Sequence, residues 1–336
     1  KQWLRQPLNN KPEIDLRLDA VEALSDNILV RNNIREALKA VYDIERLTAR
    51  ISLGTANARD LLALRASLSV LPEIKSELKA LDDTLLKSLD DSIDTFSDIY
   101  GEICSAISDE APFSVREGEI FKAGYSKELD DLKNGSKDAR QWIAGLEVKE
   151  KERTGIRTLK VGFYKVFGYY IEVSNSFKDA VPENYIRKQT LVNGERYITE
   201  ELKEYESLVL NAQTRINELE YRLFCELRMR IEELTGELQK TAAALSCIDV
   251  LCSFAESSVK LNYVKPTISE GDEIIISKGR HPVIENTVRD GVFVSNDIYV
   301  NRSDASMLLI TGPNMSGKST YMRQLALIVL MAQAGC

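Results

Sequence analysis

The feature that most constrains the fold is a long segment of helical periodicity between residues 200 and 257. Its first half places apolar residues at alternating steps of three and four, which is the spacing of a heptad seam: Leu202, Tyr205, Val209, Ala212, Ile216, Leu219 and Leu223. No proline occurs between Pro182 and Pro266, and we expect Gly236 to weaken the helix without breaking it. The pattern predicts one helix on the order of 85 Å long. A coiled-coil rod between two chains is the alternative.

A glycine-rich motif near the end of the sequence carries the clearest chemistry. Two glycines flank four residues and are followed by Lys318 and Ser319, the pattern of a phosphate-binding loop. The glycines allow a tight turn whose N–H groups face phosphate oxygens, while Lys318 reaches the outer phosphates and the Ser319 hydroxyl ligates Mg²⁺. The predicted ATP-binding residues of this loop are Gly312, Pro313, Asn314, Met315, Ser316, Gly317, Lys318, Ser319 and Thr320.

The residues around the motif favour this interpretation over an ordinary glycine-rich turn. Residues 307–310 form an apolar run, which predicts a buried parallel strand. Residues 318–334 contain no Pro or Gly and predict a helix, whose N-terminal dipole favours an anion. The order strand, loop and helix is the one that nucleotide binding requires.

The position of the loop suggests a piece of a larger protein. Only 16 residues follow Thr320, whereas an ATPase needs carboxylates on neighbouring strands to hold Mg²⁺ and position water. The sequence also begins at Lys1 without an initiator methionine. We therefore expect an excerpt cut at both ends, which by itself does not turn over ATP.

Composition narrows the class of protein. Hydrophobic residues make up 44% and charged residues 29%, as in ordinary soluble proteins, so we expect no membrane partner and a cytoplasmic location. Five cysteines without paired spacing and a single histidine predict a reduced compartment and no zinc site. The net charge of −8 argues against a protein that coats DNA generally, although it leaves room for a local basic surface.

Residues 142–199 differ from the rest in composition. They hold nine of the 24 aromatic residues, and ten basic against seven acidic residues. Residues 158–166 and 169–173 alternate like strands, and Asn193-Gly194 is a hairpin signal. We predict a small β-rich insertion, entered by a helix over residues 126–153. Its composition has two interpretations, a tip that contacts nucleic acid and a small domain with an aromatic core, and the two are compatible.

The remaining segments complete a four-part organisation. Residues 1–125 show helical periodicity, for example at Ile14, Leu18 and Val21, and predict a packed bundle without catalytic signals. An α/β pattern begins at Pro266. The predicted domains are a helical part (1–141), a β-rich insertion (142–199), a long return helix (200–261) and the N-terminal part of an ATPase domain (262–336).

Several stretches of the sequence resemble the MutS family of DNA mismatch repair proteins, and they follow the order of that family along the whole chain. They are Trp3-Leu4-Arg5-Gln6-Pro7-Leu8, Gly168-Tyr169-Tyr170-Ile171-Glu172-Val173, residues 184–199, Gly279-Arg280-His281-Pro282-Val283 and residues 311–324. The resemblance implies a mainly α fold: a lever bundle of long helices with a β-rich clamp at its tip, followed by the start of an ABC-type P-loop ATPase domain.

The resemblance also implies a function and partners. Two copies of the protein would encircle mismatched double-stranded DNA as a homodimer, use ATP and Mg²⁺, and pass the signal to downstream mismatch-repair proteins in the bacterial cytoplasm near the nucleoid. Phe293 and Val294 would contact adenine, and Arg280 and His281 would be structural. The clamp residues that would contact DNA phosphates are Lys165, Arg187, Lys188, Gln189, Asn193 and Arg196.

Some positions depart from the family pattern. Ser316 stands where the family usually has glycine, and Gly194 replaces the usual alanine. By the resemblance, the aromatic wedge that touches a mismatch lies before residue 1, and the Mg²⁺-holding carboxylates lie after Cys336.

Three other functions are weighed against this one. A chromosome-maintenance ATPase with a coiled-coil arm normally has its phosphate loop before the coil, whereas here the loop follows it. A MutS-like ATPase acting on other DNA structures lacks the clamp, which the aromatic and basic insertion argues against. A coiled-coil interaction protein would not bind ATP.

Overall fold

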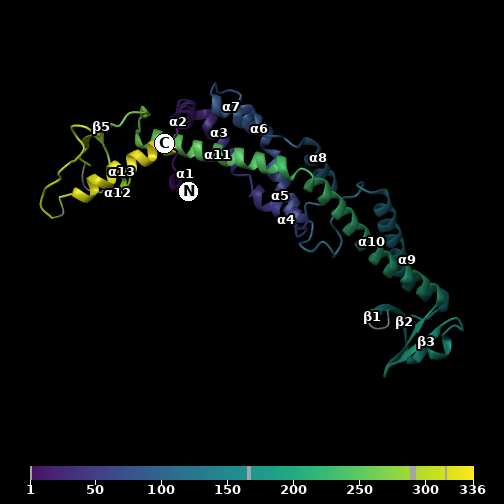
Figure 1. The fold of residues 1–336 in the computed structure, drawn as a ribbon. Coiled ribbons are helices and arrows are strands. Elements are labelled where there is room, and N and C mark those ends of the chain that lie inside the picture. The colour runs from purple at the N-terminus through teal and green to yellow at the C-terminus, as the bar shows by residue number, and fades with distance from the viewer. Residues whose placement is uncertain (1, 165–167, 288–292, 315) are drawn as a thin grey trace. The chain divides into compact units, whose positions relative to one another are not determined.

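The computed structural model describes residues 2–164, 168–287, 293–314 and 316–336. This described part is mainly helical and contains two small antiparallel sheets (Figure 1). It divides into two compact units. The first unit comprises Lys1–Glu45, Ala66–Phe96 and Gly236–Cys336, and the second comprises Arg46–Arg65 and Ser97–Thr235.

The first unit is built on a group of packed helices. They are α1 (Gln2–Arg5), α2 (Lys11–Asp26), α3 (Ile28–Leu38), α6 (Leu71–Leu78), α7 (Thr84–Asp91) and almost all of α11 (Thr235–Leu261). Helix α2 has Pro12 in its first turn, where the missing N–H costs nothing, and it packs against α3 and α7. The predicted apolar stripe Ile14, Leu18 and Val21 is buried, which confirms an amphipathic helix.

Helix α11 is the most apolar long helix of the described chain. By length and composition alone it could cross a membrane. Nine of its residues are buried within the protein, however, and the Thr241 hydroxyl accepts a hydrogen bond from the backbone N–H of Asp94 at 3.2 Å. These contacts are those of a core helix.

The C-terminal segment of the first unit carries the predicted nucleotide site. Strand β5 (Ile274–Gly279) pairs with β6 (Asn296–Val300), and the short helix α12 (Ile284–Thr287) lies between them in sequence. Helix α13 (Lys318–Ala334) has the predicted bounds and contacts β5, α1 and α2.

The predicted strand before the phosphate loop is not formed. Residues 307–310 have no regular secondary structure, and Met307 and Leu309 are 86% and 88% exposed. A buried parallel strand needs hydrogen-bonded neighbours on its flanks. Among the described residues, β5 and β6 pair only with each other in their sheet, so the apolar run is left without a neighbouring strand.

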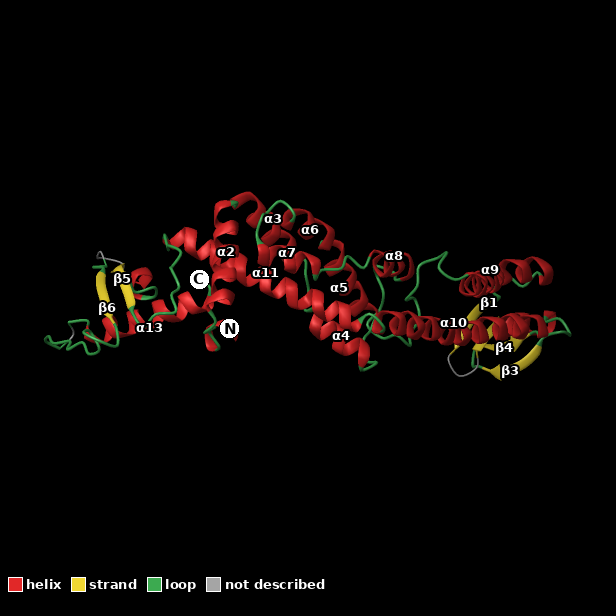
Figure 2. Ribbon diagram, turned by 45° about the horizontal axis from the view of Figure 1, so that its top comes forward, coloured by secondary structure: helices red, strands yellow, loops and turns green. Residues whose placement is uncertain are grey.

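The second unit is built around a helix pair that carries a sheet. Its elements are most of α4 (Ile44–Ser52) and α5 (Ala58–Ser69), then α8 (Ser97–Ala106), α9 (Lys127–Thr154), β1 (Lys160–Tyr164), β2 (Gly168–Ser174), the 3₁₀ helix η1 (Asn175–Ala180), β3 (Ile186–Thr190), β4 (Gly194–Ile198) and α10 (Glu200–Glu232). Helices α9 and α10 lie side by side (Figures 1 and 2).

The heptad seam of α10 is used within the chain. Leu202 and Val209 share one buried core with Ala139 and Ile143 of α9. The seam therefore has an intramolecular partner, which removes the argument for a coiled-coil rod between two chains. The side chain of Ser126 caps α9, accepting from the N–H of Leu129 at 3.4 Å, so the predicted helix over residues 126–153 is confirmed.

The prediction of one unbroken helix over residues 200–257 is wrong, whereas the predicted domain bounds, with the return segment 200–261, stay a prediction. Helix α10 ends at Glu232 and α11 begins at Thr235, with a turn at residues 233–234. Gly236 lies in the first turn of α11, where glycine costs about 1 kcal/mol relative to alanine. The Thr235 hydroxyl also donates to the carbonyl oxygen of Glu232 at 2.7 Å, giving the end of α10 a local alternative to helix continuation.

The β-rich insertion is a four-stranded antiparallel sheet, which we call the inserted sheet (β1–β4). Its strand order is β1-β2-β4-β3, and the predicted hairpin at Asn193-Gly194 connects β3 to β4. Ile171, Val173 and Tyr197 are buried in the core shared with α9 and α10. Aromatic residues therefore serve as core, one of the two interpretations of the composition.

Two carboxylates of the helix pair hold the inserted sheet through hydrogen bonds, and a third holds the residue just before β3. Glu147 of α9 accepts from the N–H of Val161 at 3.1 Å, and Glu206 of α10 accepts from the N–H of Tyr169 at 3.0 Å. Glu150 of α9 accepts from the Tyr185 hydroxyl at 2.8 Å. These contacts tie the sheet and the segment before β3 to the two helices, and the bond between Glu150 and Tyr185 is a buried one.

Candidate nucleotide and nucleic-acid sites

The phosphate loop has the backbone that an anion site needs. Gly312 and Gly317 have φ angles of +155° and +87°, the left-handed region that glycine adopts without strain. Helix α13 begins at Lys318, directly after Gly317, so its unpaired N–H groups and the positive end of its dipole face the loop. The structure thus brings the loop and helix together as predicted, although the strand before them is missing.

The side chain of Lys318 folds over the loop. Its ammonium donates to the carbonyl oxygens of Gly312 at 2.6 Å and Pro313 at 2.7 Å. Phosphate oxygens are acceptors of the same kind with more negative charge. A bound phosphate would therefore compete with these two carbonyls for Lys318.

Other predicted nucleotide residues stay predictions. Val294 is exposed and Phe293 is half-buried, and among the described residues no hydrogen bond or ring contact joins either to the loop. Ser319 and Asn314 are exposed, and Met315 lies outside the described residues. Across the described ranges, no group of three or more His, Cys, Asp or Glu side chains is arranged to hold a metal ion.

Two of the predicted DNA-contacting residues are bonded to one another on the inserted sheet. Arg196 donates to Glu172 and to Gln189, both at 3.1 Å, and its guanidinium lies 4.1 Å from the centre of the Tyr170 ring. Its side chain is 19% exposed. Arg196 is therefore mainly engaged within the sheet, and it orients Gln189.

A second cluster surrounds Glu195 of β4, which is only 3% exposed. Lys178 and Arg187 lie 2.8 Å and 3.4 Å from one carboxylate oxygen, and the Tyr197 hydroxyl donates to the other at 2.5 Å. The Lys178 and Tyr197 hydrogen bonds lower the pKa of Glu195 to about 2. Burial, followed by the bond to Glu195, raises the pKa of Tyr197 to about 12. Near neutral pH the cluster thus carries one more positive than negative charge.

Lys188 is an accessible predicted cation of the sheet. It is exposed and lies at the register shift between Arg187 and Gln189, where the β3–β4 ladder is irregular. The Arg187 side chain is 60% exposed, and Asn193 is exposed next to the hairpin. Lys165 lies outside the described residues.

Sequence reasoning missed Lys178 as a site residue. Lys178 belongs to η1, and its closeness to Arg187 depends on η1 packing against β4. The two residues are nine positions apart and follow no helical or strand period, so no sequence signal pairs them. Three accessible basic side chains, Lys178, Arg187 and Lys188, thus come from η1 and β3.

The Gly279-Arg280-His281 motif joins three elements of the first unit. Arg280 donates to the carbonyl oxygens of Leu261 at 2.9 Å and Asn262 at 2.7 Å, the C-terminal end of α11, and pairs with Glu285 of α12 at 2.8 Å. His281 is buried, and its Nδ1 accepts from two N–H groups at the start of α12. Both residues have the structural role expected of them.

The motif follows an irregularity in strand β5. The register shifts between Ile276 and Gly279, and Lys278 has a φ of +52°, which is unusual for a residue other than glycine. A Cβ atom on Gly279 would lie 2.8 Å from Nε2 of Gln324, so this glycine lets α13 approach the strand. Gln324 is fully buried, and neither of its side-chain polar atoms has a hydrogen-bond partner among the described residues.

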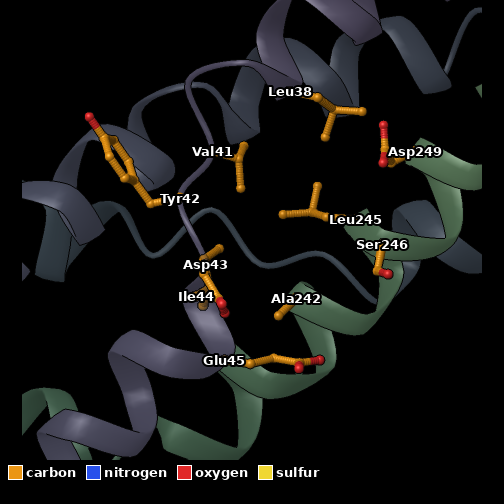
Figure 3. Close-up of a pocket in the computed structure, with 10 residues that line it drawn as sticks. All are labelled: Leu38, Val41, Tyr42, Asp43, Ile44, Glu45, Ala242, Leu245, Ser246 and Asp249. Carbon is orange, nitrogen blue, oxygen red and sulfur yellow. The ribbon is translucent and has the colours of Figure 1, made fainter. Parts of the chain in front are cut away.

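A pocket of about 310 Å³ lies apart from both predicted sites, between the turn after α3 and helix α11 (Figure 3). Leu38, Val41 and Leu245 line its apolar part, and Asp43 and Asp249 lie at its edge. None of the predicted nucleotide or DNA residues lines it.

Comparison with known protein families identifies the two parts of the chain, the helical part and the segment that begins just before the phosphate loop. Residues 1–255 match the model of MutS domain III, and residues 308–336 match that of MutS domain V. The first match covers more than half of the chain. The chain therefore belongs to the MutS family.

Individual relatives agree with the family models. The chain is 51% identical to the DNA mismatch repair protein MutS of Halothermothrix orenii, 50% to that of Acetivibrio thermocellus and 51% to that of Desulforamulus reducens. Each alignment covers 100% of this chain, which spans 37%, 38% and 39% of the respective relatives. The similarity thus extends over the whole chain and over little more than a third of each relative.

Proposed function

We propose that this chain is part of an ATP-dependent protein of DNA mismatch repair. In this protein the phosphate loop binds ATP and the inserted sheet contacts the backbone of duplex DNA. The observation that carries the proposal is the start of α13 at Lys318 behind a loop with two left-handed glycines, inside the match to MutS domain V. The names of the relatives support the repair function.

The residues present fit the triphosphate of ATP. Loop N–H groups and the N-terminus of α13 would bind phosphate oxygens, and Lys318 would exchange its two carbonyl partners for them. Ser319 would ligate Mg²⁺, and Phe293 and Val294 would contact adenine, within an ABC-type ATPase domain. ATP supplies the phosphoanhydride bond whose hydrolysis drives the cycle of the whole protein.

The inserted sheet supports contact with DNA through charge. Arg187, Lys188 and Lys178 would bind phosphates, with Asn193 and Lys165 as further contacts and Arg196 holding Gln189 in place. Phosphate contacts position a protein without reading sequence, which suits a protein that scans DNA for mispairs. In this proposal the clamp belongs to a homodimer that binds mismatched DNA and signals to downstream repair proteins.

The presence of the sheet also bears on the rival functions. Basic side chains exposed on a four-stranded insertion favour a mismatch-binding protein over a MutS-like ATPase without a clamp. A coiled-coil interaction protein is disfavoured because the heptad seam is covered by α9.

The nucleotide site is tested by measuring the ATP affinity of the whole protein and of its Lys318→Ala variant. Lys240→Ala is a matched control, because Lys240 is an exposed lysine of the same unit. Lys318→Ala should weaken ATP binding by about tenfold or more, as expected for the loss of a charge-assisted hydrogen bond. Equal affinity in all three proteins would remove the claim.

A further inference from the structure

We propose that Arg280 is a positioning residue that passes the nucleotide state of the phosphate loop to the C-terminal end of α11. The inference rests on the proposed binding of ATP, and it adds the contacts through which that binding would reach the end of α11. It starts from Lys318, whose ammonium holds two loop carbonyls that a phosphate would displace. Nucleotide binding therefore changes contacts at the first residue of α13, which is the differential interaction that any conformational response requires.

The next step of the route runs from α13 to the paired strands β5 and β6. Gln324 lies against Gly279, close enough that a Cβ atom there would meet its amide. One turn nearer the loop, the Tyr321 hydroxyl donates to the carbonyl oxygen of Asp297 in β6 at 3.1 Å. The side chain of Asp297 in turn accepts from the N–H of Lys278 at 2.6 Å. Two contacts thus connect one face of α13 to the strand pair, whose strand β5 ends just before Arg280.

The last step is Arg280 itself. Its planar guanidinium bonds to Glu285 on one side and to the carbonyl oxygens of Leu261 and Asn262 on the other. Asn262 has a φ of +53°, and the N–H of Tyr263 bonds back to the carbonyl of Ser258 at 2.9 Å, so α11 ends in a left-handed cap. Arg280 therefore binds carbonyls at this cap that the helix leaves without partners.

Through these contacts Arg280 links the movement of strand β5 to the end of α11, in addition to stabilising the fold. A shift of strands β5 and β6 would move the guanidinium of Arg280, which is bonded to the end of α11. Helix α11 follows the inserted sheet and α10 in the sequence. An apolar side chain of similar length would fill the space but would not hold the two carbonyls. Loss of Arg280 should thus uncouple the end of α11 from the nucleotide while leaving the phosphate loop intact.

The test uses hydrogen exchange on the whole protein, with and without a non-hydrolysable ATP analogue. Amides in the last turn of α11 should change their exchange rate on analogue binding by about fivefold or more, a typical size for coupling between sites. Arg280→Met should lose most of this change while binding the analogue with nearly unchanged affinity, and Arg280→Lys should recover part of it. Arg302→Met, at an exposed arginine of the same segment, is the control.

The outcomes separate this inference from the proposed function. A full nucleotide-dependent change in Arg280→Met would overturn it, as would a wild type that binds the analogue without any change at α11. A wild type that does not bind the analogue would refute the proposed function as well. If Arg280→Met does not fold, Arg280→Lys decides, because a lysine keeps the charge but cannot hold both α11 carbonyls and Glu285 with one planar group. A response in Arg280→Lys as large as that of wild type contradicts the proposal.

Discussion

The inserted sheet and the phosphate-loop segment both contain runs of apolar residues, but only those of the sheet are buried in regular secondary structure. In the sheet, apolar residues such as Ile171 and Val173 are buried against α9 and α10, the helices that flank the insertion in sequence. In the loop segment, an equally apolar run at residues 307–310 is exposed and forms no strand. An apolar pattern thus shows where a segment requires partners. Whether those partners are nearby in the chain decides if the segment becomes ordered secondary structure.

Polar side chains differ between the two regions in the same way. Glu147 and Glu206 each accept a hydrogen bond from the inserted sheet, and Glu150 accepts one from Tyr185, the residue before β3. Gln324 of α13 is fully buried, and its amide has no partner among the described residues. These three carboxylates are therefore paired, whereas the buried amide of Gln324 is not.

The largest expected difference concerns two leucines in the two regions. Leu202→Ala opens a cavity at a fully buried position of the core below the sheet, and should cost about 2–5 kcal/mol of unfolding free energy. Leu309→Ala, at a position 88% exposed, should change it by less than about 0.5 kcal/mol. Urea denaturation of this chain measures both. A cost at Leu309 as large as that at Leu202 would break the comparison.

A smaller difference is expected between Glu206, which is half-buried and hydrogen-bonded, and Gln324, which is fully buried without a partner among the described residues. Glu206→Leu leaves the N–H of Tyr169 without its acceptor and should cost about 1–2 kcal/mol. Gln324→Leu removes an amide without a described partner, so stability should stay the same or rise by up to about 1 kcal/mol. The same urea titrations apply, and a clear loss of stability in Gln324→Leu would show that its amide is paired.

The smallest effect is a pH dependence of stability in the inserted sheet. The pKa of Glu195 is lowered from 4.5 to about 2, so its ionised form stabilises the fold above pH 4.5 and this contribution is lost as the pH falls towards 2. Glu195→Gln should lower the Tm at pH 7, and the gap to wild type should close between these values.

Glu183→Gln is the control for this pH dependence, because Glu183 is exposed in the same unit. It should leave the Tm unchanged at every pH. A gap between Glu195→Gln and wild type that keeps its pH 7 size down to about pH 2 would contradict the assigned cause.

Local signals in the sequence predicted the elements that depend on neighbouring residues. The helix over residues 126–153, the Asn193-Gly194 hairpin and the bounds of α13 are all confirmed. Each depends on capping, turn geometry or periodicity within a few residues. The phosphate-loop pattern could be recognised for the same reason, since its residues are contiguous, and its binding of phosphate stays a prediction.

Features that depend on distant residues were missed or remain predictions. The apolar periodicity continues across residues 233–234 and so did not predict the break between α10 and α11 there. Nothing in the sequence pairs Lys178 with Arg187 around Glu195, because η1 brings them together only in the fold. The roles of Phe293, Val294 and Ser319 depend on a nucleotide and stay predictions.

The most direct test of the proposed DNA contact is the salt dependence of duplex binding by the whole protein. Matched and mismatched duplexes are titrated between about 50 and 200 mM salt with wild type and Arg187→Ala/Lys188→Ala. Lys79→Ala/Lys240→Ala removes two exposed charges from the first unit as a control. We predict that only the sheet variant weakens binding, equally for both duplexes, and lowers the slope of log affinity against log salt by about 2. An unchanged slope would contradict the account.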